Sequence, residues 1–237
     1  MLQERWPTLY GISSSVLPRP ADWGPELELT GYWFLDRPSG WRPPSVLEDF
    51  LASGPKPICV GFGSMPSADP EQTTQLFARA LARAGQRGIL LTGWGGLAPT
   101  ELAEGVLAIE SAPHDWLFPR VAAVVHHGGA GTTAAALRAG VPALVIPFIA
   151  DQRFWGERVA RLGAGLGPVA RRGLSPESLE TALRELVAAL RGVRDGHGYP
   201  PQQLRHLAGR QDVRDGPAQP GLPDRGHPEP AGAGGEA

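Results

Sequence analysis

The chain has 237 residues, 42% of them hydrophobic, which is enough for one large domain or two small ones with a sizeable core. A formal net charge of −2 gives no electrostatic case for nucleic-acid binding, and no apolar run approaches the roughly 20 residues that span a bilayer. The N-terminus lacks the apolar centre of a signal peptide, so we expect a cytoplasmic protein, at most peripheral to a membrane. The single cysteine, Cys59, lies in an apolar run and is predicted to be a core residue.

The stretch 1–55 is rich in proline, glycine and tryptophan, which is typical of an extended connection rather than of long helices. Trp6, Trp23, Trp33 and Trp41 predict that this stretch packs on something, because large apolar rings are costly to leave in a free linker. A short helix is expected over residues 46–51. We therefore interpret residues 1–55 as an interdomain linker and docking segment.

A regular alternation of strands and helices fills residues 56–190. The predicted strands are residues 57–62, 88–92, 106–110, 121–125 and 143–147. The predicted helices are residues 70–85, 132–140, 152–162 and 176–190, with 114–118 as a loop or a single helical turn. Strands continuous in apolar residues and separated by helices predict an α/β, Rossmann-like fold: a parallel sheet with helices on both faces.

The expected ends and inner faces of two helices can be read from single residues. Asp69 is predicted to cap the first long helix, with Pro70 as its first residue, and Ser175 and Pro176 repeat this pattern further on. The positions expected to face the core are Leu76, Phe77, Ala80, Leu81 and Ala84 in the first helix, and Phe154, Val159 and Leu162 in the helix over 152–162.

Residues 121–140, VAAVVHHGGAGTTAAALRAG, join a short apolar strand to an alanine-rich helix through a glycine turn. Such a turn places backbone N–H groups at the positive end of a helix dipole, where a phosphate can bind and glycine allows close approach. Thr132 and Thr133 can cap the helix or donate hydroxyls to the phosphate, and His127 can add a charge-assisted hydrogen bond. Glycine and threonine also serve turn geometry alone, but the adjacent His126 and His127 favour anion binding.

Polar loops follow the predicted strands at residues 63–64, Trp94, 111–114, 127–132 and 150–152. Ligands of parallel sheets bind where the strands reach their carboxyl ends, so these loops predict one binding site at one edge. After residue 191 the chain is crowded with glycine and proline, and Leu204 and Leu207 are too few to form a core. Residues 191–237 are therefore predicted to be an irregular tail, disordered or loosely packed.

Two segments, SAPHDWLFPRVAAVVHHGGAGTTAAALRAG and PFIADQRFWGERV, resemble the C-terminal, donor-binding half of GT-B glycosyltransferases. The resemblance is greatest to the group that contains UDP-glucose:sterol and glycopeptide/macrolide glycosyltransferases. The segments PRPADWGPELELTGYWF and CVGFGSM fit the same group, so that the resemblance covers roughly residues 6–190. It implies a UDP-sugar donor, UDP-glucose above all, and neither a cofactor nor a metal.

The resemblance also implies a set of donor-binding residues. They are Ser64, Trp94, Ser111, Ala112, His114, His127, Gly129, Ala130, Gly131, Thr132, Asp151 and Gln152. Ser64 and Trp94 would line the nucleotide cleft, where Trp94 would stack on the base or serve as a core or lid residue. Residues 111–112 would offer backbone groups to the uracil, His114 and His127 would flank ribose and diphosphate, and residues 129–132 would hold the diphosphate.

At the sugar end, the resemblance implies that Asp151 and Gln152 contact sugar hydroxyls. From the residues alone, helix capping by Asp151 remains an alternative. The N-terminal half of the family, which binds the acceptor and carries the histidine general base, has no counterpart in these 237 residues. No catalytic residue is therefore assigned.

The resulting hypothesis is the donor-binding domain of an inverting glycosyltransferase. It would transfer a hexose from a UDP-sugar to a hydroxyl of a lipid or natural-product acceptor, and it would be inactive alone. The acceptor would be reached through the missing half, which a partner chain can supply. The alternatives are a nucleotide-sugar-binding subunit of a two-chain enzyme and a non-catalytic remnant.

Overall fold

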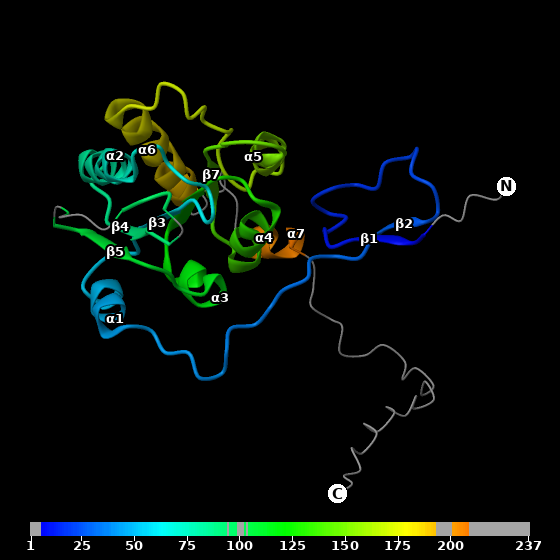
Figure 1. The fold of residues 1–237 in the computed structure, drawn as a ribbon, viewed down its shortest axis with the longest axis horizontal. Coiled ribbons are helices and arrows are strands. Elements are labelled where there is room, and N and C mark those ends of the chain that lie inside the picture. The colour runs from blue at the N-terminus through cyan, green and yellow to red at the C-terminus, as the bar shows by residue number, and fades with distance from the viewer. Residues whose placement is uncertain (1–5, 94, 99–101, 103, 193–200, 209–237) are drawn as a thin grey trace, which may run out of the picture.

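The computed structural model describes residues 6–93, 95–98, 102, 104–192 and 201–208. Within these residues a five-stranded parallel sheet has the strand order β5-β4-β3-β6-β7 (Figure 1). Its strands are β3 (Ile58–Gly61), β4 (Gly88–Leu91), β5 (Val106–Ile109), β6 (Ala123–His126) and β7 (Ala143–Val145). The α/β fold with a parallel sheet, predicted from alternating apolar runs and helices, is confirmed.

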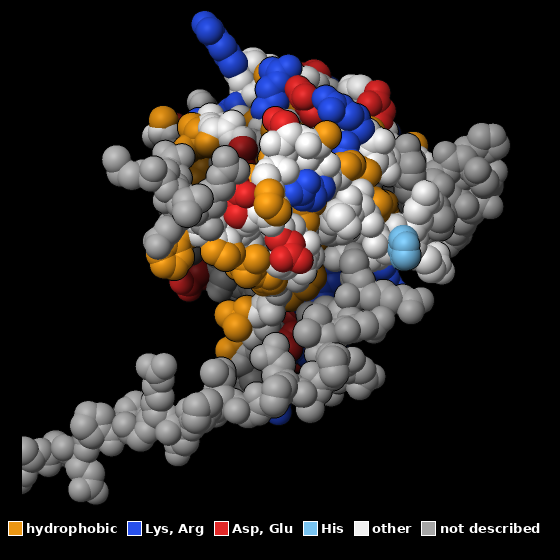
Figure 2. Space-filling model, turned by 90° about the vertical axis from the view of Figure 1, so that its right-hand side faces the viewer, with side chains coloured by type: hydrophobic (Ala, Val, Ile, Leu, Met, Phe, Trp, Pro, Cys, Tyr) orange, Lys and Arg blue, Asp and Glu red, His pale blue; other side chains and the backbone are white. Residues whose placement is uncertain are grey.

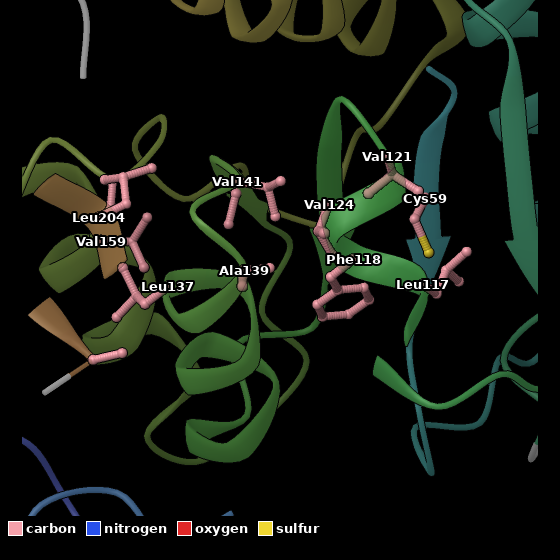
Figure 3. Packing of buried hydrophobic residues seen from close by; sticks show 14 of the residues in the cluster. Cys59, Leu117, Phe118, Val121, Val124, Leu137, Ala139, Val141, Val159 and Leu204 are labelled. Carbon is pink, nitrogen blue, oxygen red and sulfur yellow. The ribbon is translucent and has the colours of Figure 1, made fainter. Parts of the chain in front are cut away.

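Helices cover both faces of this sheet (Figure 1). They are α1 (Ser45–Ala52), α2 (Pro70–Arg83), α3 (His114–Leu117) with the 3-10 turn η1 (Phe118–Arg120), α4 (Ala130–Ala139), α5 (Gln152–Arg161), α6 (Pro176–Gly192) and α7 (Pro201–Leu207). Alternate residues of β3 point to opposite faces: Ile58 and Val60 pack with α2 and α6, while Cys59 packs with η1 and α4. Figure 3 shows the apolar cluster on the Cys59 side of the sheet, with Cys59 beside Leu117 and Val124.

Cys59 is the core residue that the sequence predicted. Its side chain is 1% exposed, and burial raises the pKa of the thiol to about 12. The predicted helix starts are also confirmed at α2, where the Asp69 carboxylate accepts the Gln72 N–H at 2.8 Å. At α6 the Ser175 hydroxyl accepts the Ser178 N–H at 3.2 Å. Local capping chemistry therefore fixes where these two helices begin.

Two expectations about helices were wrong: one about how α4 starts, and one about which residues of α5 face the core. Helix α4 begins at Ala130 rather than at Thr132, and Thr133 does not cap it, because its hydroxyl donates back to the Gly129 carbonyl at 3.0 Å. In α5 the side chain of Phe154 is 43% exposed, and its neighbour Trp155 is buried instead. Trp155 and Val159, one turn apart, lie together on the buried face of this helix.

The N-terminal segment contains structure that the sequence did not predict. Strands β1 (Thr8–Tyr10) and β2 (Leu27–Leu29) pair in parallel beside the main body of the molecule (Figure 1). Trp23 stacks on Tyr10 with ring centroids 4.7 Å apart, and Trp41 meets Trp116 edge to face at 5.3 Å. The expected packing of tryptophans thus holds for these two rings.

Trp6 and Trp33 of the same segment stay 78% and 67% exposed. The predicted short helix over residues 46–51 is present as α1. The two strands have three residues each, too few for an alternating pattern to stand out among the prolines. The segment still docks on the core, since the Val16 carbonyl accepts a hydrogen bond from Arg158 of α5.

Part of the predicted irregular tail is a packed helix. Leu204 of α7 is 1% exposed and lies near Leu137 of α4 (Figure 3). Ala208, directly after the helix, is 4% exposed, and both residues belong to the same apolar cluster. The prediction failed because two turns of helix need no core of their own when an apolar surface already exists to be covered. Residues 193–200 and 209–237 of the predicted tail lie outside the described residues.

Basic and acidic side chains are intermixed on the face drawn in Figure 2. This arrangement agrees with the small net charge and offers no single-sign surface on that face for a polyanion. Along the part of the chain that the structure describes, every helix is too short or too polar to cross a bilayer.

Candidate functional site

The carboxyl ends of the parallel strands bring the predicted loops to one edge of the sheet (Figure 1). A cavity of about 220 Å³ opens at this edge. It is lined by Cys59, Gly61, Gly63, Leu91, Gly93, Glu110, Ser111, Ala112, His114, Phe118, Val124 and Thr132. Four of the predicted site residues, from two separate loops, therefore line a common space: Ser111, Ala112, His114 and Thr132.

A second cavity of about 520 Å³ lies between residues 33–38, α3 and α4. Gly131 and His114 are among its lining residues, and His114 lines both cavities. The predicted turn residue Gly131 therefore borders the larger cavity, and His114 is a wall that the two cavities share. A ligand longer than one cavity can lie across the start of α4.

The turn between β6 and α4 leaves the start of the helix open. Gly128 has φ +96°, a conformation that favours glycine, and Gly129 is the N-cap of α4 without any side-chain cap. The N–H groups of the first helical turn, from Ala130 to Thr132, have no partner within the helix. A Cβ at Gly131 would meet no atom within 4 Å, so the space above this turn is free. This geometry is that of an anion-binding helix N-terminus.

His126 supports this turn from inside the sheet. Its side chain is fully buried, and its Nδ1 accepts the N–H of Gly128 at 3.0 Å. Burial first, and then the nearby His127 and His114, lower the pKa of His126 to about 3. The imidazole is therefore neutral, with its proton on Nε2. The sequence placed His126 in the turn, but it gave no sign that this side chain holds the backbone of Gly128.

His127 lies over the opposite side of the turn, between two glycines. A Cβ added at Gly129 would come within 2.5 Å of its Nε2, and one added at Gly63 within 3.3 Å of its Cε1. The ring is half-buried, and its Nδ1 has no hydrogen-bond partner among the described residues. Burial lowers the pKa of His127, so near pH 7 it would offer a neutral N–H, and the charge in a bond to phosphate would come from the anion.

His114 begins α3 and stacks on Phe118, with ring centroids 4.4 Å apart. Burial lowers its pKa, Asp115 acts in the opposite direction, and His127 lowers it further. Ser64 is exposed in the loop after β3, next to the Gly63 that His127 contacts. Trp94, predicted to stack on the base, lies outside the described residues.

The turn between β7 and α5 is built from side chains. The Gln152 carboxamide is buried, and its Oε1 accepts the N–H groups of Phe148 at 2.7 Å and Ile149 at 3.0 Å. Its Nε2 donates to the Met65 sulfur at 3.2 Å, which links this turn to the loop after β3. Gln152 was predicted to contact a sugar; its Oε1 is already in use, and one N–H of Nε2 remains for that role.

Asp151 is exposed and occupies the N-cap position of α5, yet it makes no capping hydrogen bond. Its Oδ2 accepts instead the indole N–H of Trp155 at 2.7 Å. The capping alternative, left open by the sequence, is therefore wrong. Among the described residues, no group of three or more His, Cys, Asp and Glu is arranged to hold a metal ion.

The chain is similar to glycosyltransferases in sequence. A family model for "Erythromycin biosynthesis protein CIII-like, C-terminal domain" matches residues 97–195. A sterol 3-beta-glucosyltransferase of Arabidopsis thaliana is 47% identical over 175 residues, which is 73% of this chain and 28% of the plant protein. An O-mycaminosyltylonolide 6-deoxyallosyltransferase of Streptomyces fradiae is 44% identical over 182 residues, which is 76% of this chain and 42% of that enzyme.

Solved structures are similar in fold. The glycotransferase of kitacinnamycin has a TM-score of 0.64 at 20% identity, covering 85% of this chain and 51% of its own. CalG4, the calicheamicin glycosyltransferase, has a TM-score of 0.60 at 23% identity and covers 85% of this chain and 47% of its own. The chain thus spans less than a third of the plant relative and about half of each solved structure.

Proposed function

The chain belongs to the GT-B glycosyltransferases, as a relative of the C-terminal domain of their sterol glucosyltransferase and erythromycin CIII-like members, and on this premise we propose that it binds the nucleotide-sugar donor. The donor is a UDP-hexose, UDP-glucose first among them, because the relatives are named as glucosyl- and deoxyallosyltransferases. The observation that carries this proposal is the uncapped glycine turn at the start of α4, beside two cavities that meet at His114.

Each part of the donor has a matching region at this edge. The diphosphate lies on the first-turn N–H groups of α4, where the helix dipole and the N–H of His127 stabilise its charge. The base enters the cavity of about 220 Å³, whose lining includes Ser111 and Ala112. The hexose extends toward Asp151 at the start of α5. These contacts become stronger as negative charge develops on the leaving diphosphate. In this way such a site lowers the free-energy barrier to sugar transfer.

The reaction proposed for the whole protein is an inverting displacement. A hydroxyl of a lipid or natural-product acceptor attacks the anomeric carbon, and UDP departs. Such attack needs a base within about 3 Å of the hydroxyl and a pocket that holds the acceptor. His114, His126 and His127 belong to the donor edge, so these requirements fall to an acceptor-binding half. A polypeptide of these 237 residues should therefore bind UDP-glucose without forming a glycoside.

Titration calorimetry with UDP, TDP, ADP and their sugars tests the donor assignment directly. The substitution His127→Ala should weaken UDP binding by about 1–3 kcal/mol, because it removes a hydrogen bond to a charged group. The matched control is His206→Ala, the same change on the exposed face of α7, which should leave UDP affinity unchanged. Absence of UDP binding, or equal affinity in wild type and His127→Ala, would contradict the proposal.

An assay of UDP release and glycoside formation, with a panel of sterols and polyphenols, tests the catalytic part. Acceptor-dependent transfer by the purified 237-residue polypeptide would refute its expected inactivity. Transfer only after a family N-terminal half is added in trans would identify a two-chain arrangement. UDP binding without transfer in either case would favour a binding protein that has lost catalysis.

A further inference from the structure

We propose that Trp155 is a positioning residue: its indole N–H orients the Asp151 carboxylate toward the hexose of the donor. This inference rests on the donor site proposed above and adds to it a residue without ligand contact. Its basis is the hydrogen bond from Trp155 Nε1 to Asp151 Oδ2, 2.7 Å long, between residues one helical turn apart.

The donor of this hydrogen bond is held rigidly. Trp155 is 4% exposed and packs in the apolar cluster that lies on the α4 side of the sheet, with Val159 one turn further along α5. Phe154 meets it edge to face with ring centroids 5.2 Å apart. Because close packing fixes the ring, the direction of its N–H is fixed as well. Asp151, in contrast, is exposed, so its carboxylate has no packing of its own to hold it.

The carboxylate gives up a more usual bond to make this one. An aspartate at an N-cap normally accepts an N–H of the first helical turn, which stabilises a helix by about 1 kcal/mol. Asp151 makes no such bond, and the residue before it, Ala150, has the strained φ of +55°. The carboxylate thus bonds to a side chain one turn along α5 and not to the N–H groups of the first turn. The indole bonds to Oδ2, and among the described residues no other hydrogen bond to this carboxylate is formed, so Oδ1 can accept a hydrogen bond from a sugar hydroxyl.

The backbone of the same turn has a separate support. Gln152 holds it from inside, because its Oε1 accepts the N–H groups of Phe148 and Ile149. Loss of the indole N–H should therefore release the Asp151 carboxylate while the turn keeps its shape. This separation predicts that Trp155 affects recognition of the sugar and leaves recognition of UDP unchanged.

The test compares UDP-glucose and UDP by titration calorimetry on the full chain, in wild type, Trp155→Phe, Asp151→Ala and the double variant. Phenylalanine keeps an aromatic ring in the core and removes the N–H. We expect Trp155→Phe to weaken UDP-glucose binding about tenfold and to change UDP affinity less than twofold. In the Asp151→Ala background it should add less than twofold, because its partner is gone. Trp23→Phe, in the ring stacked on Tyr10, is the matched control and should change neither affinity.

The role of Trp155 would be overturned, and the donor site kept, by either of two results. One is an equal loss of affinity for UDP and UDP-glucose in Trp155→Phe, and the other is a tenfold loss that persists in the Asp151→Ala background. If wild type fails to bind UDP, the donor site and the role that rests on it both fall. The indole N–H resonance of Trp155 in wild type gives a second measurement, assigned by its shift in Asp151→Ala. It should move on addition of UDP-glucose and stay in place with UDP, and the reverse would contradict the proposal even if Trp155→Phe does not fold.

Discussion

Two turns of this molecule occupy equivalent positions and are built in opposite ways. The β6–α4 turn and the β7–α5 turn each lead from a parallel strand to a helix, and the two strands are neighbours in the sheet. The first presents backbone: Gly128 at φ +96° and an N-cap, Gly129, without a side-chain cap. The second presents side chains, with Gln152 clamping the backbone and Trp155 holding Asp151.

The difference follows from the chemistry of what each turn is proposed to contact. A diphosphate carries its charge on many oxygens and is bound well by several N–H groups that approach closely, and glycine in the turn makes this approach easier. A sugar is distinguished by the directions of its hydroxyls, and directed acceptors are side-chain atoms. The proposed site thus divides affinity from specificity between two adjacent turns.

The largest expected effect comes from the place where the two turns touch. A Cβ at Gly128 would lie 2.6 Å from the Gln152 carbonyl oxygen and 2.7 Å from Val145 Cγ1, on a backbone with φ +96°. Gly128→Ala should therefore lower the free energy of unfolding by about 3–5 kcal/mol, measured by urea denaturation. Gly131→Ala is the matched control, because its Cβ meets nothing within 4 Å, and its stability should equal or exceed that of wild type. Similar losses of stability in both variants would show that the close approach of the two turns at Gly128 is not the cause.

The next effect concerns ligand affinity at the β6–α4 turn and leaves the stability of the fold unchanged. Gly131→Val adds branched carbon atoms at the open start of α4, where the diphosphate is proposed to lie. UDP affinity should fall on the order of 100-fold, because the anion can no longer approach the N–H groups, while the urea midpoint stays within experimental error. Calorimetry with UDP and UDP-glucose should show the same loss for both ligands. A loss confined to UDP-glucose would place the sugar, and not the diphosphate, on this turn.

Much of this comparison was visible in the sequence. The glycine turn at residues 127–131, the strand before it and the caps at Asp69 and Ser175 are local features, readable from residue types and spacing. The convergence of loops at one sheet edge followed from the parallel fold alone. Backbone sites are predictable for this reason: their signal is glycine at a strand end.

The side-chain site was less predictable, because its contacts join residues whose directions depend on packing. The sequence placed Asp151 and Gln152 at the sheet edge, but Gln152 turns inward to Met65, and Asp151 is held by Trp155. Which of two adjacent aromatic residues enters the core depends on how α5 packs, and the core residue is Trp155 and not the predicted Phe154. The buried role of His126 and the docking of α7 also depend on contacts between elements, which local patterns do not show.

The last effect tests the side chain that supports the backbone-built turn. His126 holds the Gly128 N–H through Nδ1, and its pKa is lowered from 6.5 to about 3, chiefly by burial. Between these values the unfolded chain binds a proton that the folded chain does not. The contribution of this group to stability is therefore complete above pH 6.5 and is lost as the pH falls toward 3, with a slope of at most about 1.4 kcal/mol per pH unit. His127 and His114, whose pKa values are also lowered, act in the same direction just below pH 6.5.

The substitution His126→Asn isolates this contribution, because an amide oxygen can accept the Gly128 N–H and does not titrate in this range. Urea denaturation at several pH values from 7 to 4 should give a shallower fall in the free energy of unfolding for His126→Asn than for wild type. The two curves should differ most at the acidic end, where the unfolded wild type gains its proton. Parallel curves would mean that the loss of stability in acid comes from groups other than His126. The glycine turn would then be held by its backbone alone, without help from this side chain.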